Sequence, residues 1–177
     1  MSSYEEQRAR HIGDIRSAAR SHQLRLAWTR AGIDETQARG LRTLLAHAAE
    51  RSPFYRERLA GVDLTAVTPQ DMRAIPPVTK GELMERWDDV VTDRTLRRSD
   101  LERFVEEQTA FGYYADRYQV FESGGSSGVR GIYVWDWQFF VTTANLAFRY
   151  EIRDTRAAGL PAGRRLRRAA VTSGVPP

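Results

Sequence analysis

One stretch of the chain is rich in the small residues that can surround a phosphate group. Residues 122–131 hold four glycines and three serines. Glycines let several backbone N–H groups converge on an anion, serine hydroxyls donate further hydrogen bonds, and an arginine adds a bidentate positive partner. The candidate phosphate-binding residues are therefore Ser123, Gly124, Gly125, Ser126, Ser127, Gly128 and Arg130.

The same stretch has a second interpretation, because Gly-Gly and Ser-Gly pairs are also typical of β-hairpin turns. Two known nucleotide motifs do not match it. The Walker pattern requires Gly-Lys-Ser/Thr, but the only lysine of the chain is Lys80, far upstream. The dinucleotide pattern requires a different glycine spacing and a helix after the loop, whereas a strand is expected here.

Short helices with proline and glycine between them are expected before this stretch. Capping residues and helical spacing mark their starts: Asp34 precedes an apolar face of leucines, and capping boxes begin at Thr79 and Ser99. Gly32 is expected to close the first helix. The predicted helices cover about 4–30, 34–52, 53–59, a short turn after Thr68, 79–87 and 99–108.

Strands are expected on both sides of the glycine-rich stretch. Residues 118–121 and 132–135 are rich in β-branched and aromatic side chains, which favours two strands joined by that stretch. Asp136 is a suitable N-cap for a long helix over 137–157. After a break at 159–163, residues 166–172 are predicted to begin a buried strand.

Three ordered blocks carry a resemblance to a known family. They are 44–55 (LLAHAAERSPFY), 75–83 (IPPVTKGEL) and 123–134 (SGGSSGVRGIYV). Together they resemble the phenylacetate–coenzyme A ligase branch of the adenylate-forming (acyl-CoA synthetase-like) enzymes, from about residue 37 to the end. The sequence departs from the family loop in two ways. Gly124 stands where many members have serine, and Val129-Arg130 follows Gly128 where the family commonly has Lys-Pro.

The resemblance implies a chemistry for the loop. Family members activate a carboxylic acid with ATP and magnesium, form an acyl-adenylate and pyrophosphate, and transfer the acyl group to coenzyme A. In that scheme the residues matching the loop hold the β- and γ-phosphates, with Ser126 and Ser127 as the first candidates and Gly125 and Gly128 as backbone donors. Positioning and charge stabilisation then supply most of the catalysis.

The resemblance also implies that catalytic elements of the family lie beyond this sequence, among them a C-terminal lysine that Lys80 cannot replace. The expected fold is α/β: an incomplete N-terminal domain of an adenylate-forming ligase over 36–177, preceded by a helical extension over 1–35. The expected function is that of the N-terminal portion of an aryl- or phenylacetate-like acid–coenzyme A ligase, inactive alone. Truncation, gene decay and a split gene are the three explanations for such a portion, and in a split gene the remaining portion would be a separate partner chain. The alternative is a non-catalytic nucleotide- or partner-binding module.

Composition limits the other classes. The chain has 177 residues, no cysteine and a net charge of +4. Lys80 is the only lysine among 27 basic residues, so we interpret the arginine excess as coding bias, and an arginine-driven nucleic-acid binder is kept only as a third hypothesis. No apolar run reaches the roughly 18 residues of a membrane span, and no secretory signal is visible. A cytoplasmic protein without nucleic-acid or membrane partners is therefore expected.

Three further groups of residues have a structural and a functional interpretation. The spacing of His11, His22 and His47 offers no metal site. Aromatic residues near 137 either border an acid pocket or, as we favour, form core at a strand-to-helix junction. Basic residues near 166 either form a recognition patch or, as we favour, flank a strand. The aromatic residues are Trp135, Trp137, Phe139 and Phe140, and the basic residues are Arg164, Arg165, Arg167 and Arg168.

Overall fold

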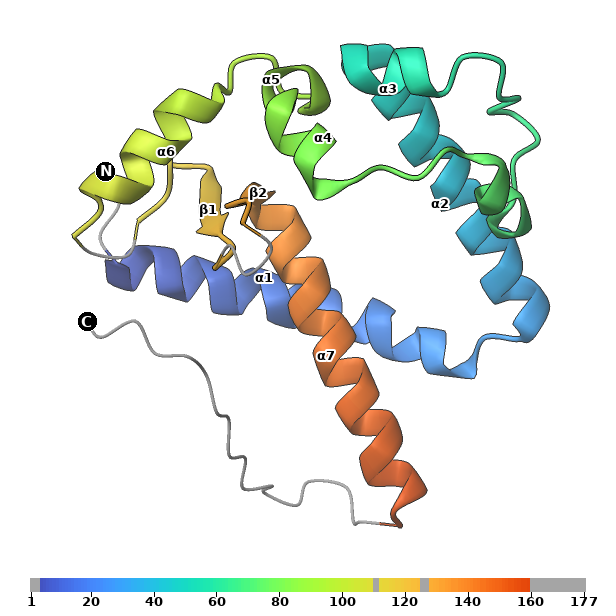
Figure 1. Ribbon diagram of the computed structural model, residues 1–177. Coiled ribbons are helices and arrows are strands. Elements are labelled where there is room, and N and C mark those ends of the chain that lie inside the picture. Colours follow the sequence, from blue (N-terminus) through green and yellow to red (C-terminus); the bar gives the residue numbers. More distant parts are fainter. Residues whose placement is uncertain (1–3, 110–111, 125–127, 160–177) are drawn as a thin grey trace. The chain divides into compact units, whose positions relative to one another are not determined.

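The structure is a computed structural model, and it describes residues 4–109, 112–124 and 128–159 (Figure 1). The predicted strand at 166–172, the arginines at 164–168 and the central loop residues Gly125, Ser126 and Ser127 lie outside the described residues. All structural statements below concern the described part of the chain.

The fold is mixed α/β and mostly helical, with one two-stranded antiparallel hairpin. The predicted order is confirmed at this level: a helical region, then the hairpin, then a long helix. The elements are α1 (Tyr4–Leu24), η1 (Arg25–Ala27), α2 (Arg30–Arg51), α3 (Pro53–Arg58), η2 (Pro69–Ala74), α4 (Lys80–Glu85), α5 (Trp87–Val90), α6 (Arg98–Glu107), β1 (Tyr118–Glu122), β2 (Ile132–Asp136) and α7 (Trp137–Ala157).

Contacts divide the chain into two compact units. The first, here called the helix-pair unit, comprises Met1–Ala27, Thr109–Gly112 and Asp136–Pro177. The second, here called the hairpin unit, comprises Trp28–Gln108 and Tyr113–Trp135. Each is described by itself.

In the helix-pair unit, α7 crosses α1 and the two helices pack together (Figure 1). Val141 and Asn145 are the buried residues of α7, and the Asn145 amide donates to the Ile15 carbonyl of α1 at 3.1 Å. The Trp137 indole donates to Asp14 at 2.7 Å and stacks on His11 with ring centroids 3.2 Å apart. Trp137 is half-buried against α1, whereas Phe139 is 48% exposed, so the core interpretation of these aromatic residues is confirmed only in part.

The hairpin unit has two apolar clusters. In the larger one, both strands pack against α4, α5 and α6, and its buried members are Met84, Trp87, Leu96, Leu101, Tyr118 and Ile132. The smaller cluster joins α2 to the chain that follows α3 through Leu45, Leu59 and Val67, with Tyr55 and Ile75 packed against it. Burial of these side chains is the main force that holds such short helices in place.

Several predicted element boundaries are confirmed. Ser52 ends α2 and also caps α3, accepting a hydrogen bond from the Tyr55 N–H at 3.2 Å. Thr68 and Asp71 form the capping box of η2, and Thr79 and Glu82 form that of α4. Asp136 caps α7 by accepting from the Phe139 N–H at 2.7 Å.

The predicted junction between the first two helices is wrong. The first helix ends at Leu24 and continues only as the short η1, and Thr29, not Asp34, caps α2. Gly32 therefore does not close a helix: it lies in the first turn of α2 and donates its N–H to the Thr29 hydroxyl at 3.2 Å. Asp34 is used differently, in an ion pair with Arg30 one turn earlier.

The predicted capping box at Ser99 is also wrong. Helix α6 begins at Arg98, and the side chain of its N-cap residue, Arg97, makes no capping hydrogen bond. The Asp88 carboxylate, ten residues upstream, accepts the Arg98 N–H at 2.9 Å instead. A tertiary contact has replaced the local cap.

Candidate functional site

The candidate site is the neck of the glycine-rich loop, where the chain leaves β1 and enters β2. Two hydrogen bonds close this neck: Ser123 N–H donates to the Gly131 carbonyl, and Gly131 N–H donates to the Ser123 hydroxyl, both at 2.9 Å. The loop residues between them therefore start and finish at one point. The described residues next to the neck, Gly124, Gly128, Val129 and Arg130, are exposed.

The side chain of Lys80 holds both sides of this neck. Its ammonium group donates to the Ser123 hydroxyl at 2.8 Å and to the Val129 carbonyl at 2.5 Å. An ammonium group has three donor hydrogens, so one remains after these two bonds. Lys80 thus places a positive charge at the neck of the loop, between the residues that begin the loop and those that end it.

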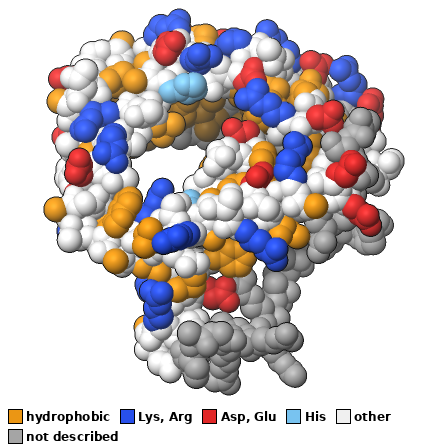
Figure 2. Space-filling model, turned by 180° about the vertical axis from the view of Figure 1, so that it is seen from behind, with side chains coloured by type: hydrophobic (Ala, Val, Ile, Leu, Met, Phe, Trp, Pro, Cys, Tyr) orange, Lys and Arg blue, Asp and Glu red, His pale blue; other side chains and the backbone are white. Residues whose placement is uncertain are grey.

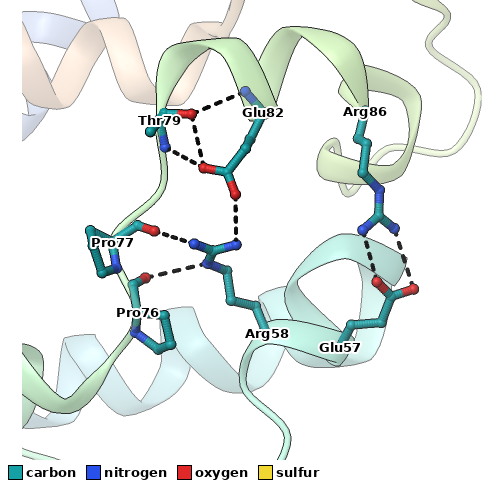
Figure 3. A network of polar contacts seen from close by, with 7 residues as sticks. All are labelled: Glu57, Arg58, Pro76, Pro77, Thr79, Glu82 and Arg86. Atoms are coloured by element: carbon teal, nitrogen blue, oxygen red, sulfur yellow. Dashed lines mark hydrogen bonds and ion pairs between the residues drawn. The ribbon is translucent and has the colours of Figure 1, made fainter.

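Lys80 is held in position by the first turn of α4 (Figure 3). Thr79 donates its backbone N–H and its hydroxyl to the Glu82 carboxylate at 2.8 and 2.9 Å. The Arg58 guanidinium donates to Glu82 at 3.2 Å and to the carbonyls of Pro76 and Pro77. The Thr79 hydrogen bonds, with the Arg58 charge, hold the pKa of Glu82 below its ordinary value. The network therefore fixes both the segment 76–79, which precedes Lys80, and the first turn of α4, which contains Lys80.

The following turn of the same segment holds the start of β2. Ile132 N–H donates to the Met84 sulfur at 3.3 Å, and the Trp87 indole donates to the Ile132 carbonyl at 3.0 Å. Ile132 is 2% exposed. Helices α4 and α5 therefore position both Lys80 and the strand that carries the end of the loop.

The surroundings of two loop glycines favour glycine. A Cβ at Gly131 would lie 2.6 Å from the Tyr133 hydroxyl and 2.8 Å from Cε of Lys80, so a larger residue there would have to displace the ends of these two side chains. Gly128 has a φ of 80°, a conformation that other residues rarely adopt. Among the described residues, no atom lies within 4 Å of a Cβ at Gly124.

The structure brings some predicted site residues together and separates one. Ser123 lies at the neck and contacts Lys80, and Gly128 forms the turn before Val129. Arg130 points to solvent: its side chain is 80% exposed, and Nη1 lies 4.0 Å from the Glu122 carboxylate across the neck. Gly125, Ser126 and Ser127 lie outside the described residues.

Lys80 was not among the site residues predicted from the sequence. Two signals were nevertheless present: it is the only lysine of an arginine-rich chain, and it directly follows Thr79, the first residue of a capping box. The contact that matters joins residues 43 positions apart in the sequence, which no local pattern specifies.

The family-like blocks are neighbours in the hairpin unit. Lys80 of the block 75–83 contacts Ser123 and Val129 of the block 123–134. Ile75 of the second block packs against the cluster that contains Leu45 of the first. Three segments that are separate in the sequence therefore form one connected region.

The described residues hold no group of three or more His, Cys, Asp or Glu side chains placed to bind a metal ion. Lys80, the Ser123 hydroxyl and the backbone N–H groups of the exposed described loop residues are donors of the kind that bind phosphate groups. No helix in the described ranges combines the length and apolarity needed to cross a bilayer. Figure 2 shows arginine and acidic side chains interspersed over the face that it draws.

Comparison with family models, with curated proteins and with solved structures finds no match for this chain.

Proposed function

We propose that the hairpin unit is the phosphate-binding part of an ATP-dependent ligase that activates a carboxylic acid, aryl or phenylacetate-like, for transfer to coenzyme A. The observation that carries the proposal is the Lys80 clamp on the neck of the glycine-rich loop. A lysine that only stabilised a turn would not require a glycine-rich loop, and a glycine-rich turn would not require a lysine. A positive charge beside a glycine-rich loop is suited to binding an anion.

In the proposed reaction these residues bind and orient the phosphates of ATP and form no covalent bond with them. In the proposed reaction a carboxylate oxygen attacks the α-phosphorus of ATP, the bond to the bridging oxygen breaks, and pyrophosphate leaves with the electron pair. Charge builds up on the departing phosphates, so fixed N–H groups and a nearby cation stabilise the transition state. Lys80 supplies the cation, and Ser123 and Gly131 keep the loop closed around it.

The role of Lys80 has two components that a variant series can separate. As a structural clamp it holds the neck, and as a cation it attracts phosphate. Lys80→Met removes both, whereas Lys80→Arg keeps the charge. Arg130→Gln removes the other loop cation and its 4.0 Å ion pair with Glu122, but it leaves the contacts among Ser123, Gly131 and Lys80 in place.

The test is calorimetric titration of the chain with ATP, pyrophosphate and AMP. We expect pyrophosphate and ATP to bind, AMP to bind more weakly, and Lys80→Met to reduce pyrophosphate affinity about tenfold or more. Lys80→Arg should restore part of that loss, and the wild-type affinity should fall as salt rises. Absence of pyrophosphate binding in the folded wild-type chain would overturn the proposal.

A second measurement distinguishes a ligase from a nucleotide-binding module. Pyrophosphate–ATP exchange is followed with aryl acids present and absent, using the chain alone. Acid-dependent exchange supports the ligase and contradicts the expected inactivity of the isolated chain. ATP binding without exchange on any acid supports the module, which was the alternative drawn from the sequence.

A further inference from the structure

A concave site lies in the hairpin unit, lined by the segment 75–78 and by residues of the helices before it. It is a groove of about 670 Å³ between α2, α3 and η2. Its wall is mostly apolar, with Leu44, Leu45, Tyr55, Met72, Ile75 and Val78 among the lining residues. Leu44 is 63% exposed and Met72 is 44% exposed, so two large apolar side chains of the groove face solvent.

One wall of the groove is rigid before any ligand enters. Pro76 and Pro77 line it, and each proline ring fixes its own φ. Their carbonyls are hydrogen-bonded to Arg58, as Figure 3 shows, so these polar groups need no water or ligand. A preformed apolar surface with its polar groups already paired costs little to cover.

Charge at the groove is of one sign. The described residues that line it include two arginines and no aspartate or glutamate. Arg58 is fully engaged by Glu82 and the proline carbonyls. Arg73, at the end of η2, is exposed and makes no ion pair within the described residues, and nearby Asp71 is taken by the capping box with Thr68. One available guanidinium therefore stands beside an apolar wall.

The dimensions favour a small molecule over a helical partner. Helix α2 contributes only residues between Leu44 and Ala48 to the groove, which is about one turn or 6 Å of helix. A helix docked in a groove needs apolar anchors over two or more turns. The volume lies within the range of about 300–1,000 Å³ that is usual for small-molecule sites.

We propose that this groove binds a single-chain carboxylate, with its alkyl or aryl body against Leu44 and Met72 and its carboxylate on Arg73. This site is separate from the proposed phosphate site at Lys80, and it does not rest on the ligase proposal. It would let the chain hold an apolar acid whether or not the loop binds nucleotide.

The experiment titrates the chain with decanoate, decanol and acetate, all below the concentration at which decanoate forms micelles. We expect one decanoate per chain, and an affinity about tenfold lower in Arg73→Gln with decanol binding unchanged. Leu44→Ser should weaken both decanoate and decanol, and it should fold because Leu44 is exposed. Arg20→Gln, an exposed arginine in the helix-pair unit, is the charge-matched control and should change neither.

Three results would overturn the inference. The first is equal loss of decanoate affinity in Arg73→Gln and Arg20→Gln, which would indicate net charge alone. The second is acetate binding as tightly as decanoate. The third is an acidic amphipathic peptide that binds the groove in preference to decanoate. ATP binding is measured on the same Arg73→Gln sample, and we expect it to be unchanged, so failure here and failure of the ligase proposal are distinguishable.

Discussion

The two units of the chain reach stability by different routes. The helix-pair unit consists mainly of α1 and α7, each 21 residues long, whose interior hydrogen bonds are satisfied along the helix itself. Its interface includes polar buried groups, His22 and Asn145. The hairpin unit is built largely from helices of four to ten residues, apart from α2, and has two apolar clusters.

The difference shows what short elements require. A short helix has few internal bonds, so most of its end groups need other partners. In the hairpin unit these partners are side chains from distant positions: Ser52 donates to the Asp89 carbonyl, Asp88 accepts from Arg98, and Arg58 donates to Pro76. Such contacts fix the backbone in place, as the proposed phosphate site at the loop would require.

The largest expected effect comes from the core of the hairpin unit. Leu101 is 0% exposed, and Leu101→Ala should lower the free energy of unfolding of that unit by about 3 kcal/mol, because it leaves a cavity. Val141→Ala removes less volume from the helix-pair unit and should cost about 1–2 kcal/mol there. Amide hydrogen exchange followed by mass spectrometry reports on each unit separately. Equal effects of Leu101→Ala and the conservative control Leu101→Met would contradict the packing assignment.

A smaller effect is expected at the neck of the loop. Gly131→Ala should displace Tyr133 and Lys80, lower the free energy of unfolding of the hairpin unit by about 1–2 kcal/mol, and raise exchange at 118–122 and 132–135. Gly40→Ala is the matched control. No atom lies within 4 Å of its added Cβ, and it sits inside α2, so it should stabilise by up to about 1 kcal/mol. A neutral Gly131→Ala would show that the neck is not closely packed.

The smallest expected effect is a difference in acid sensitivity. Burial lowers the pKa of His22, and the charges of Arg25 and Arg149 lower it further. The unfolded chain then takes up a proton that the folded helix pair resists. The helix pair therefore keeps its full free energy of unfolding above pH 6.5, the ordinary pKa of histidine, and loses part of it as pH falls below 6.5. Exchange in α1 and α7, corrected for intrinsic rates, should rise between pH 7.5 and 5.5, and His22→Gln should flatten this response.

The hairpin unit should respond at lower pH. Hydrogen bonds from the Thr95 hydroxyl and the Tyr118 hydroxyl, with the Arg117 charge, lower the pKa of Asp93 from 3.8 to about 2. The stabilisation is complete above pH 3.8 and is lost as pH falls toward 2. Solvent screening reduces it to the order of 1 kcal/mol. If both units lost protection over the same pH range, the separate assignments of His22 and Asp93 would be wrong.

Local patterns predicted most elements and some of their ends. Ser52-Pro53, Thr79–Glu82 and Asp136 were placed correctly because each of these caps is satisfied by its own next turn. The start of α2 was misplaced because Thr29 and Asp34 are both acceptable caps, and the sequence alone does not rank them. The start of α6 was misplaced because its cap, Asp88, comes from another element.

The candidate site was also predicted only where it depends on local sequence. The loop composition and the glycine at 128 are local properties, and they were visible in the sequence. The partner of the loop was not, because Lys80 reaches Ser123 across 43 residues and depends on the packing of α4 and α5 against β2. The sequence predicted one apolar face of leucines on α2, but its leucines differ: Leu45 is buried, whereas Leu44 is 63% exposed and lines the groove.

A single ε-amine in 177 residues has a practical consequence. Any reagent that is selective for lysine side chains modifies this protein at the mouth of the loop and at no other side chain. The rate at which an activated ester labels Lys80 therefore becomes a direct gauge of whether the loop is open, clamped or occupied. Because such esters also react with the α-amino group of the chain, the label is read in the peptide that contains Lys80 after digestion.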